Sequence, residues 1–424
     1  MRRSLPQVRR KRDAVLLSVL CFSVYMVSYI GRLNYSAALT EMTAAGVLSK
    51  TQGGAIATAY FLCYGAGQMF NGFLADRSWP VWQVTAGIAG SVALNLLMPF
   101  ARSWRLMVIL WGANGYSQSL IWAPSFRMIS QSISFVWRAK ALLLLNMASP
   151  AGTVAAYLFS SLVLASGDWR QVFNGAAVCM GLFALLWVLV SRRIYRGAEA
   201  PVPSEMEMPA PEQGGKGEPI FPLLIGSCAI YLVLPSVIHG MLKDGITNWL
   251  PVYMSEVFSL SSQRAVAWSI FLPIINMLGA VVAYFLMRRT RNEVLSAAIV
   301  FTGSTASLAL LWLFGSHSPM FTVLLFSLVT MGMTAANVLF CSEVPSRFSY
   351  AGRAAAVSGF FNSSAYIGSA ASMYAVAWIS QRYGWTVTQL IWIGVCALGI
   401  LCCARAIPGW ERFLDARQVL MRQK

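Results

Sequence analysis

Long apolar stretches recur along this chain, and they limit the folds that it can adopt. Twelve stretches contain about 18 or more residues, so each can cross the hydrocarbon core of a bilayer as a helix. They cover residues 14–39, 53–74, 81–101, 106–126, 141–163, 171–191, 221–250, 264–287, 293–314, 320–341, 354–378 and 388–405. Only 11% of the residues are charged and the mean hydropathy is +0.62, whereas soluble domains carry about 25% charge. We therefore predict an all-α integral membrane protein with twelve transmembrane helices.

Basic residues are unevenly distributed between the two ends of these spans. The chain has 32 Lys and Arg against 15 Asp and Glu, a formal net charge of +17. With a cytoplasmic N-terminus, 24 of the 32 basic residues fall in cytoplasmic segments and 6 in outer loops, as the positive-inside rule requires. The first span is too long for a signal-peptide core, so it is read as an uncleaved helix. We expect a multi-pass protein of the cell membrane with both termini in the cytoplasm, and no nucleic-acid partner is needed to explain the charge.

A polar segment rich in Pro, Gly and Glu divides the chain near its middle. Residues 192–220 contain few apolar side chains, so they cannot bury enough surface to fold and are predicted to be a flexible cytoplasmic linker. The expected domains are a six-helix bundle over residues 1–191 and a second over residues 221–424, which ends in a short cytoplasmic tail.

The two predicted bundles resemble each other in sequence. Gln52 and Gln263, like Arg32 and Lys243, are separated by 211 residues, and anchors around the fifth span of each half match at offsets of 215 to 216. This repetition predicts two pseudo-symmetric bundles related by an axis along the membrane normal. Transporters built in this way place their substrate site near the midplane, between the repeats.

Two cations inside predicted spans, Arg32 and Lys243, are the main candidates for binding residues. A charge within a membrane span costs roughly 2.5–3.5 kcal/mol on insertion scales, so such residues usually face a cavity and serve function. An anion with two or more oxygens can bridge two cations through charge-assisted hydrogen bonds. The alternative is that Lys243 pairs with Asp244 and that Arg32 extends toward the outer interface.

Polar residues share a helix face with Arg32 and recur in the second span. The first stripe, at helical spacing, comprises Tyr25, Tyr29, Arg32 and Ser36. The second comprises Tyr60, Tyr64, Gly67 and Asn71. Phenol hydroxyls beside an arginine can line a substrate path, although tyrosine is also common in membrane proteins for other reasons.

A histidine lies one helical turn before Lys243. His239 shares the face of Lys243 and, because histidine titrates near neutral pH, it can relay a proton in a coupled transporter. The alternative is that its ring only forms a hydrogen bond with a neighbouring residue. Asp244 is grouped with His239 as a coupling candidate.

The turn between the second and third spans reads Gly-Phe-Leu-Ala-Asp-Arg, residues 72–77. Its small residue permits close helix approach, and Asp76 and Arg77 can pair with a helix end in one transport state. We expect this turn to act as a cytoplasmic gate rather than as part of the substrate site.

Searches for other chemistry favour no enzyme. The eight cysteines fall within spans without metal-like spacing, and His239 and His317 alone cannot form a zinc site. There is no phosphate-binding glycine loop of the nucleotide-binding type. We expect no catalytic residue, no metal and no cofactor.

Twelve spans, a central linker and the turn at 72–77 resemble the major facilitator superfamily over nearly the whole chain. Within it, several segments resemble the organophosphate:phosphate antiporters, the glycerol-3-phosphate and hexose-phosphate carriers. The matching residues are Tyr25, Tyr29, Arg32, Asn34, Tyr64, Gly115, Gln118, Trp122, Pro124, Arg127, Lys243 and Tyr366. The resemblance implies that Arg32 and Lys243 bind phosphate, with Tyr25, Tyr29, Tyr64 and Tyr366 as further substrate-binding residues. Asn146, one of the anchors that match around the fifth span, is also expected to bind substrate.

The chain departs from that pattern at several positions. Lys243 replaces the second phosphate-binding arginine and loses its bidentate fork, while Gln68 replaces a lysine and Ser149 a histidine. Leu33, Asn248 and Ile274 stand at positions where the carriers have charged residues. A carboxylate or a monoanionic substrate therefore competes with a phosphate ester.

The sequence predicts a secondary transporter that moves a small organic anion by alternating access, a phosphorylated metabolite exchanged for phosphate. One alternative is a proton- or sodium-coupled carboxylate symporter. Another is a transporter-like membrane sensor that binds the anion and signals to a partner. The expected partners are the small anion and the lipid bilayer, and the protein is expected to be a monomer.

Overall fold

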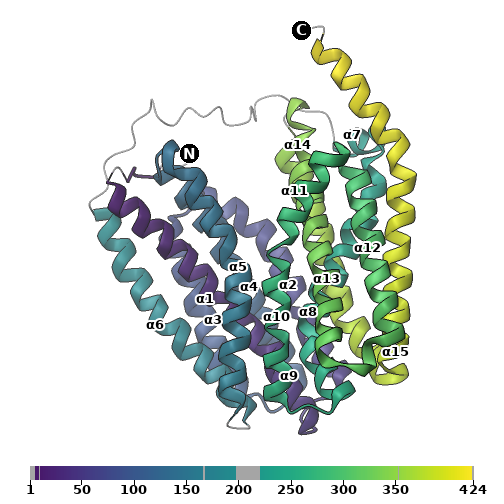
Figure 1. The fold of residues 1–424 in the computed structure, drawn as a ribbon. Coiled ribbons are helices and arrows are strands. Elements are labelled where there is room, and N and C mark those ends of the chain that lie inside the picture. Colours follow the sequence, from purple (N-terminus) through teal and green to yellow (C-terminus); the bar gives the residue numbers. More distant parts are fainter. Residues whose placement is uncertain (1–4, 9, 166–167, 197–219, 352, 423–424) are drawn as a thin grey trace. The chain divides into compact units, whose positions relative to one another are not determined.

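The computed structural model describes residues 5–8, 10–165, 168–196, 220–351 and 353–422, and nearly all of them lie in helices (Figure 1). They form two compact units. The first unit comprises Met1–Met208 and Asn248–Pro273, and the second comprises Pro209–Thr247 and Ile274–Lys424. The predicted linker falls largely on residues 197–219, which lie outside the described residues, so the predicted domain boundaries stay predictions.

Six long helices form most of the first unit. They are α1 (Lys11–Ala44), α2 (Lys50–Arg77), α3 (Pro80–Leu97), α4 (Trp104–Ser132), α5 (Phe135–Leu164) and α6 (Trp169–Arg196), with a short helix η1 (Met98–Phe100) after α3. Helix α1 packs against α5 and α6, α2 against α4, and α3 against α4 and α6 (Figure 1). Buried side chains such as Leu17, Val84, Met128 and Trp187 form its apolar core. The short helix α9 (Ser262–Ser269) packs on α5 in the same unit.

Local sequence signals explain where these helices begin. The Ser49 side chain accepts a hydrogen bond from the Gln52 backbone, and the Gln52 side chain accepts one from the Ser49 backbone. This capping box satisfies backbone donors that the first turn of α2 would otherwise leave without partners. Pro80 occupies the first turn of α3, where its fixed φ suits a helix start.

The second unit is also helical. Its first elements are α7 (Ile220–Gly226), η3 (Ala229–Leu232) and α8 (Val233–Phe258), of which α8 continues into the first unit after Thr247. They are followed by α10 (Phe271–Asn276), α11 (Gly279–Thr290), α12 (Glu293–Phe314), η4 (Gly315–His317), α13 (Pro319–Val338), η5 (Leu339–Glu343), α14 (Val344–Ser346), η6 (Ser349–Ala351) and α15 (Ala354–Arg422). Helix α12 packs against both α13 and α15. The turn η5 is a π-helix, a form that often occurs at functional sites.

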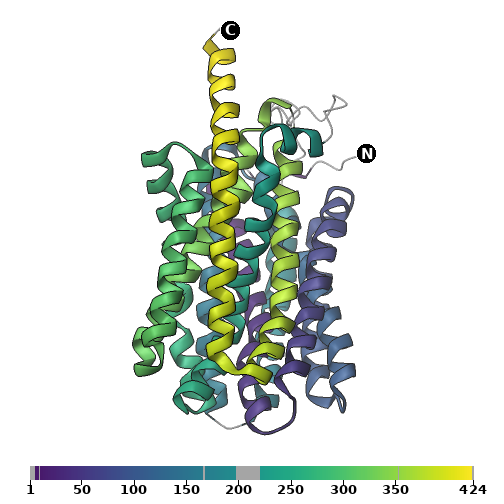
Figure 2. The same ribbon diagram turned by 90° about the vertical axis from the view of Figure 1, so that its right-hand side faces the viewer.

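Helix α15 contains two of the predicted spans. Gly384 lies inside it with φ 81° and ψ 175°, a backbone conformation that side chains disfavour and glycine permits. Figure 2 shows the sharp turn at which the chain passes from the first part of α15 into the yellow C-terminal part. The predicted spans 354–378 and 388–405 lie on either side of Gly384.

Most predicted spans coincide with helices that are long and apolar enough to cross a membrane. Within the described residues there are nine such helical segments; one is the bent α15, and another, Ser262–Thr290, contains α9, α10 and α11. Helices α2 and α4 correspond to the second and fourth predicted spans, with 28 and 29 residues, but they carry more polar residues and are outside this set. With α15 counted as two spans, the described helices account for the twelve expected, and the all-α membrane fold is confirmed.

The predicted span 264–287 is not one continuous helix. It is divided among α9, α10 and α11, with breaks near Ile270 and Met277. Pro273 has no N–H group to bond the carbonyl of Ser269, where α9 ends. Hydropathy alone cannot reveal such a break, because it reports composition and not backbone hydrogen bonding.

Candidate functional site

Arg32 lies in α1 of the first unit within a group of four aromatic rings. Its guanidinium carbon is 4.9 Å from the ring centroid of Tyr64, 5.2 Å from Phe61, 5.3 Å from Tyr29 and 5.5 Å from Tyr60. These distances are typical of cation–π contacts, which stabilise a cation away from bulk water. The side chain is half-buried. The four rings therefore explain how α1 can hold a charge within a membrane span.

Two hydroxyls of this aromatic group are held by neighbouring helices. Ser149 Oγ on α5 donates a hydrogen bond to the Tyr29 hydroxyl at 2.7 Å, and the Tyr60 hydroxyl donates to Gln118 Oε1 on α4 at 2.9 Å. Because side chains from α4 and α5 hold rings from α1 and α2, four helices of the first unit position Arg32.

Tyr64 has its own local partner. Gln68, one turn later on α2, donates a hydrogen bond from Nε2 to the Tyr64 hydroxyl at 2.8 Å. Tyr60 and Tyr64 are stacked with ring centroids 5.9 Å apart. Gln68, which stands where the organophosphate carriers have a lysine, thus helps to order Tyr64, the ring nearest Arg32.

A buried amide network supports α1 on the side of α3 and α4. Asn34 donates to Asn95 Oδ1 at 2.7 Å, and Asn114 donates to the Gly31 carbonyl at 3.0 Å. Ser91 connects the network by donating to Asn114 Oδ1 at 2.6 Å. Buried polar groups fix geometry when they are paired, so this network helps to fix the backbone on both sides of Arg32.

The chemistry available at Arg32 follows from the shape of its side chain. A guanidinium has five N–H donors in its plane, whereas cation–π contacts use its faces. The planar arrangement of these donors matches the paired oxygens of a phosphate or carboxylate. The arrangement around Arg32 is suited to an oxyanion.

The other candidates of the first unit lie at different distances from this group. Tyr25 packs on Tyr29 with ring centroids 5.5 Å apart and on Trp122 at 4.8 Å. Asn146 on α5 is exposed, and its amide donates to the carbonyl of Leu142 on its own helix at 2.9 Å. Tyr25 is therefore continuous with the aromatic group through Tyr29, whereas the contacts of Asn146 are local to α5.

Lys243 lies on α8 in the second unit. Its Nζ is 3.9 Å from Asp244 Oδ1, longer than a hydrogen bond, and 37% of its side chain is exposed. The Asp244 carboxylate accepts a 2.6 Å hydrogen bond from Ser369 on α15 through its other oxygen. Ser369 thus holds Asp244, and Lys243 keeps ammonium donors that the weak contact with Asp244 does not use.

His239 lies deeper in the second unit, with 1% of its surface exposed. Its Nε2 is 3.1 Å from the amide nitrogen of Asn337 on α13, and its ring centroid is 5.9 Å from that of Phe340 in η5. Because an amide nitrogen can only donate, Nε2 acts as the acceptor. A coupling role for His239 stays a prediction, as does the substrate-binding role of the half-buried Tyr366 on α15.

The predicted gate is only partly described. Asp76 and Arg77 lie in the last turn of α2, and their side chains are outside the described part of the structure. The neighbouring turn is held by Arg127, whose Nη1 donates to the Ser78 carbonyl at 3.1 Å. Gate roles for Asp76 and Arg77 therefore stay predictions.

Several residues at these positions were not selected from the sequence. Phe61 follows Tyr60 directly, so helical spacing alone places it outside the stripe of Tyr60 and Tyr64, yet its ring contacts Arg32. Ser369 and Asn337 are distant in sequence from the residues that they hold, and no local pattern identifies them. Ser369 follows the candidate Tyr366 by three residues, so helical spacing could have placed it on the same face as that residue.

Comparisons with known proteins agree with this architecture. A sequence profile of the Major Facilitator Superfamily matches residues 21–372. A glycerol-3-phosphate transporter of Bacillus subtilis is 25% identical over 427 residues, covering 93% of this chain and 92% of the relative. The membrane sensor protein UhpC of Salmonella typhimurium is 26% identical, covering 85% and 84%. A protein from Chlamydia muridarum named "Probable hexose phosphate transport protein" is 20% identical, covering 92% and 89%.

Solved structures show the same fold. A bacterial homologue of the human lysosomal transporter Spinster, in an inward-facing and unoccupied conformation, superposes with a TM-score of 0.78 at 15% identity. The superposition covers 96% of this chain and 98% of that one. The nucleoside transporter NupG superposes with a TM-score of 0.71 at 14% identity and covers 92% and 99%.

Proposed function

The chain belongs to the Major Facilitator Superfamily, and from this premise we propose that it moves a small organic anion, a phosphorylated metabolite exchanged for inorganic phosphate. The observation that carries the proposal is Arg32 among four aromatic rings on α1 and α2. A cation within a membrane span can bind an oxyanion through charge-assisted hydrogen bonds, whereas transport of a neutral solute does not require a cation there. Lys243 is the proposed second cation, at the equivalent position of the second half.

Similarity to phosphate-ester carriers supports the choice of substrate class. The Bacillus subtilis relative is named for glycerol 3-phosphate and the Chlamydia muridarum relative for hexose phosphate. The common part of these compounds is a phosphate monoester, so the proposed site recognises the phosphoryl group. Lys243 provides a single point charge where the carriers have the bidentate fork of an arginine. We therefore propose that the site accepts a broader range of phosphate esters.

We also propose that transport proceeds by alternating access. Polar contacts within the first unit support this proposal, because they hold two segments of that unit together and can be broken. Lys50 Nζ on α2 lies 2.9 Å from Glu256 Oε2 near the end of α8, and the Ser262 hydroxyl donates to the carboxylate of Glu41 on α1. These polar contacts hold Asn248–Pro273 to α1 and α2, and they can break and re-form in a transport cycle.

Exchange in proteoliposomes tests the proposal. Vesicles loaded with inorganic phosphate should take up labelled phosphate or glycerol 3-phosphate from outside without any ion gradient. Arg32→Gln and Lys243→Gln should each lower the exchange rate by about tenfold or more, since each removes a charge-assisted contact with the anion. Arg382→Gln, a change of an exposed arginine on α15, is the matched control and should leave exchange unchanged. Undiminished exchange in both site variants would falsify the shared anion site.

The same experiment separates the competing functions. Uptake of carboxylates that requires a proton or sodium gradient and depends on His239 indicates a coupled symporter. Similarity to the sensor UhpC keeps a signalling function in view. Anion binding that raises the melting temperature without any flux supports that function and contradicts transport.

A further inference from the structure

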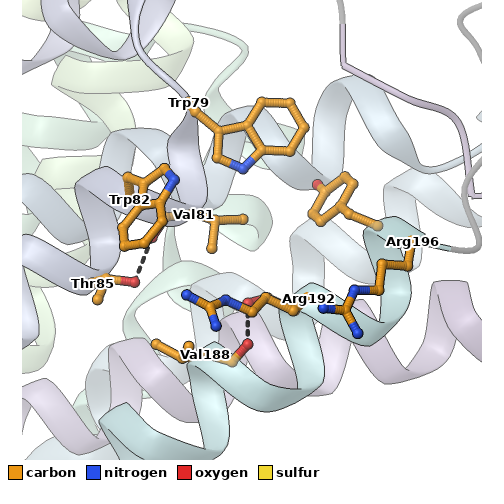
Figure 3. A pocket seen from close by; sticks show the side chains of 9 residues that line it. Trp79, Val81, Trp82, Thr85, Val188, Arg192 and Arg196 are labelled. Atoms are coloured by element: carbon orange, nitrogen blue, oxygen red, sulfur yellow. Dashed lines mark hydrogen bonds between the residues drawn. The ribbon is translucent and has the colours of Figure 1, made fainter.

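A pocket outside the Arg32 site lies where α3 begins and α6 ends in the first unit (Figure 3). It encloses roughly 230 Å³ and is lined by Trp79, Trp82 and Thr85 from one side and by Arg192, Tyr195 and Arg196 from the other. This volume is below the roughly 300–1,000 Å³ of most small-molecule sites. It suits a charged group of a larger molecule.

The pocket combines positive charge with aromatic surface. The Arg192 guanidinium lies 5.6 Å from the ring centroid of Trp82, and Arg196 follows one turn later on α6 (Figure 3). Within the described part of the chain, neither guanidinium has a carboxylate within 4.0 Å. Both are exposed. The pocket thus offers two arginines, with no described acid to neutralise them, to a negatively charged group.

The remaining walls are fixed by other contacts. The rings of Trp79 and Tyr195 meet edge to face with centroids 5.2 Å apart, and the Tyr195 hydroxyl lies 3.1 Å from that of Ser132 at the end of α4. The Thr85 hydroxyl donates to the Val81 carbonyl at 2.7 Å. The arginines are the charged groups among these lining side chains, and the aromatic wall is held in place by these contacts.

An apolar track on α6 continues from the pocket toward the middle of the span. Leu189, Leu185 and Leu182 precede Arg192 by 3, 7 and 10 residues, so they lie on its helix face, and they are 58%, 60% and 67% exposed. Trp82 at the pocket rim is 60% exposed. Arginine and tryptophan beside an exposed leucine track are typical of the level where lipid headgroups meet acyl chains.

We propose that this pocket binds the phosphate headgroup of an anionic phospholipid. Arg192 and Arg196 contact the phosphate, Trp82 supports the Arg192 guanidinium, and an acyl chain lies along the three leucines. The sequence predicts this end of the unit to be cytoplasmic, the side where anionic lipid attracts basic residues. A free phosphate would use the arginines but would gain nothing from the leucine track.

Lipid titration of the purified full-length protein tests the site. Binding of phosphatidylglycerol, with phosphatidylcholine as reference, is measured by native mass spectrometry after delipidation. Each basic residue near an anionic surface contributes about a fivefold effect, so Arg192→Gln/Arg196→Gln should weaken phosphatidylglycerol binding by about 25-fold. The matched control Arg288→Gln/Arg289→Gln removes the same charge from the last turn of α11 and should change binding by less than about twofold.

Four outcomes would overturn the proposal. Equal losses in both double variants indicate non-specific surface charge. Displacement of phosphatidylglycerol by inorganic phosphate or by its headgroup without chains indicates a free-anion site. Retained binding in a folded Arg192→Gln/Arg196→Gln protein rules the pocket out. Arg192→Lys/Arg196→Lys keeps both charges, so it should retain most of the affinity for phosphatidylglycerol and serves as a control for folding. A loss of affinity equal to that of Arg192→Gln/Arg196→Gln would contradict the charge-based site.

Discussion

Gly152 on α5 lies directly against the backbone of α1 at Met26. A Cβ built on Gly152 would lie 2.5 Å from the Met26 carbonyl oxygen. In the second unit, a Cβ on Gly368 would collide with the carbonyl oxygen of Val237 on α8. The two glycines are 216 residues apart and the two carbonyls 211 apart, the offsets that relate the halves in sequence. The equivalent helix pair of each unit thus makes the same kind of close contact, which supports an internal duplication.

We predict that Gly368→Ala destabilises the protein. The added methyl group meets a backbone carbonyl that cannot rotate away, so α8 and α15 must separate, and overpacking of this kind costs about 1–3 kcal/mol. The melting temperature of the purified protein measures the effect. Gly359→Ala is the control, because a Cβ added at that position of the same helix would have no other atom within 4 Å. Alanine there should be neutral or stabilising. Equal melting temperatures for the two variants would contradict the close contact.

A second prediction concerns the ring nearest Arg32. Tyr64→Phe keeps the aromatic face but loses the hydrogen bond with Gln68, so it should change the KM for phosphate exchange by less than about threefold. Tyr64→Ala removes the cation–π contact, worth about 0.5–2 kcal/mol, and should raise KM by about 2- to 30-fold. The test is the comparison of KM in the two variants. Equal effects of Phe and Ala would show that the hydroxyl, and not the ring, supports Arg32.

The sequence allowed part of the Arg32 site to be predicted, and its limits have a physical cause. Tyr29 was identified because helical spacing places it on the same face as Arg32, and Tyr64 because it belongs to the polar stripe of the second span. Ser149 and Gln118 hold Tyr29 and Tyr60 from other helices, and these contacts depend on packing that no local period encodes. Phe61 was missed for the same reason.

The membrane spans show a similar division. Composition identified every long helix, since a bilayer core demands apolar length. It did not identify the breaks near Ile270 and Met277, nor the bend at Gly384 within α15, because they depend on backbone geometry. It also did not show that α8 contributes to both units.

A third prediction concerns a buried carboxylate at the start of α12. Glu293 has no exposed side-chain surface; it accepts hydrogen bonds from Arg347 Nε at 2.6 Å and from Trp410 Nε1 at 2.9 Å. Glu293→Ala leaves these donors without a partner and should lower the free energy of unfolding by about 1–3 kcal/mol. Thermal melting measures the loss. Glu343→Ala, which removes a nearby half-buried carboxylate, is the control. If both variants melt alike, Glu293 does not organise this end of the unit.

The last prediction concerns the ion pair between Lys50 and Glu256. The pair is 2.9 Å long, with 14% of the Lys50 side chain and 37% of the Glu256 side chain exposed. A partly exposed pair of this kind contributes about 0–1 kcal/mol, enough to change a two-state population by up to about fivefold. Glu256→Lys should therefore raise hydrogen exchange in Asn248–Phe258 and alter the phosphate exchange rate.

The reversed pair provides the decisive comparison. Lys50→Glu/Glu256→Lys restores opposite charges at the same positions and should recover both hydrogen-exchange protection and transport rate. Each single variant places like charges opposite each other, which is unfavourable, so the two defects should not add. Rising salt should narrow the difference between the single variants and the wild type, because screening weakens exposed charges. Additive defects in the double variant would show that Lys50 and Glu256 act separately, and would remove this contact from the proposed closure.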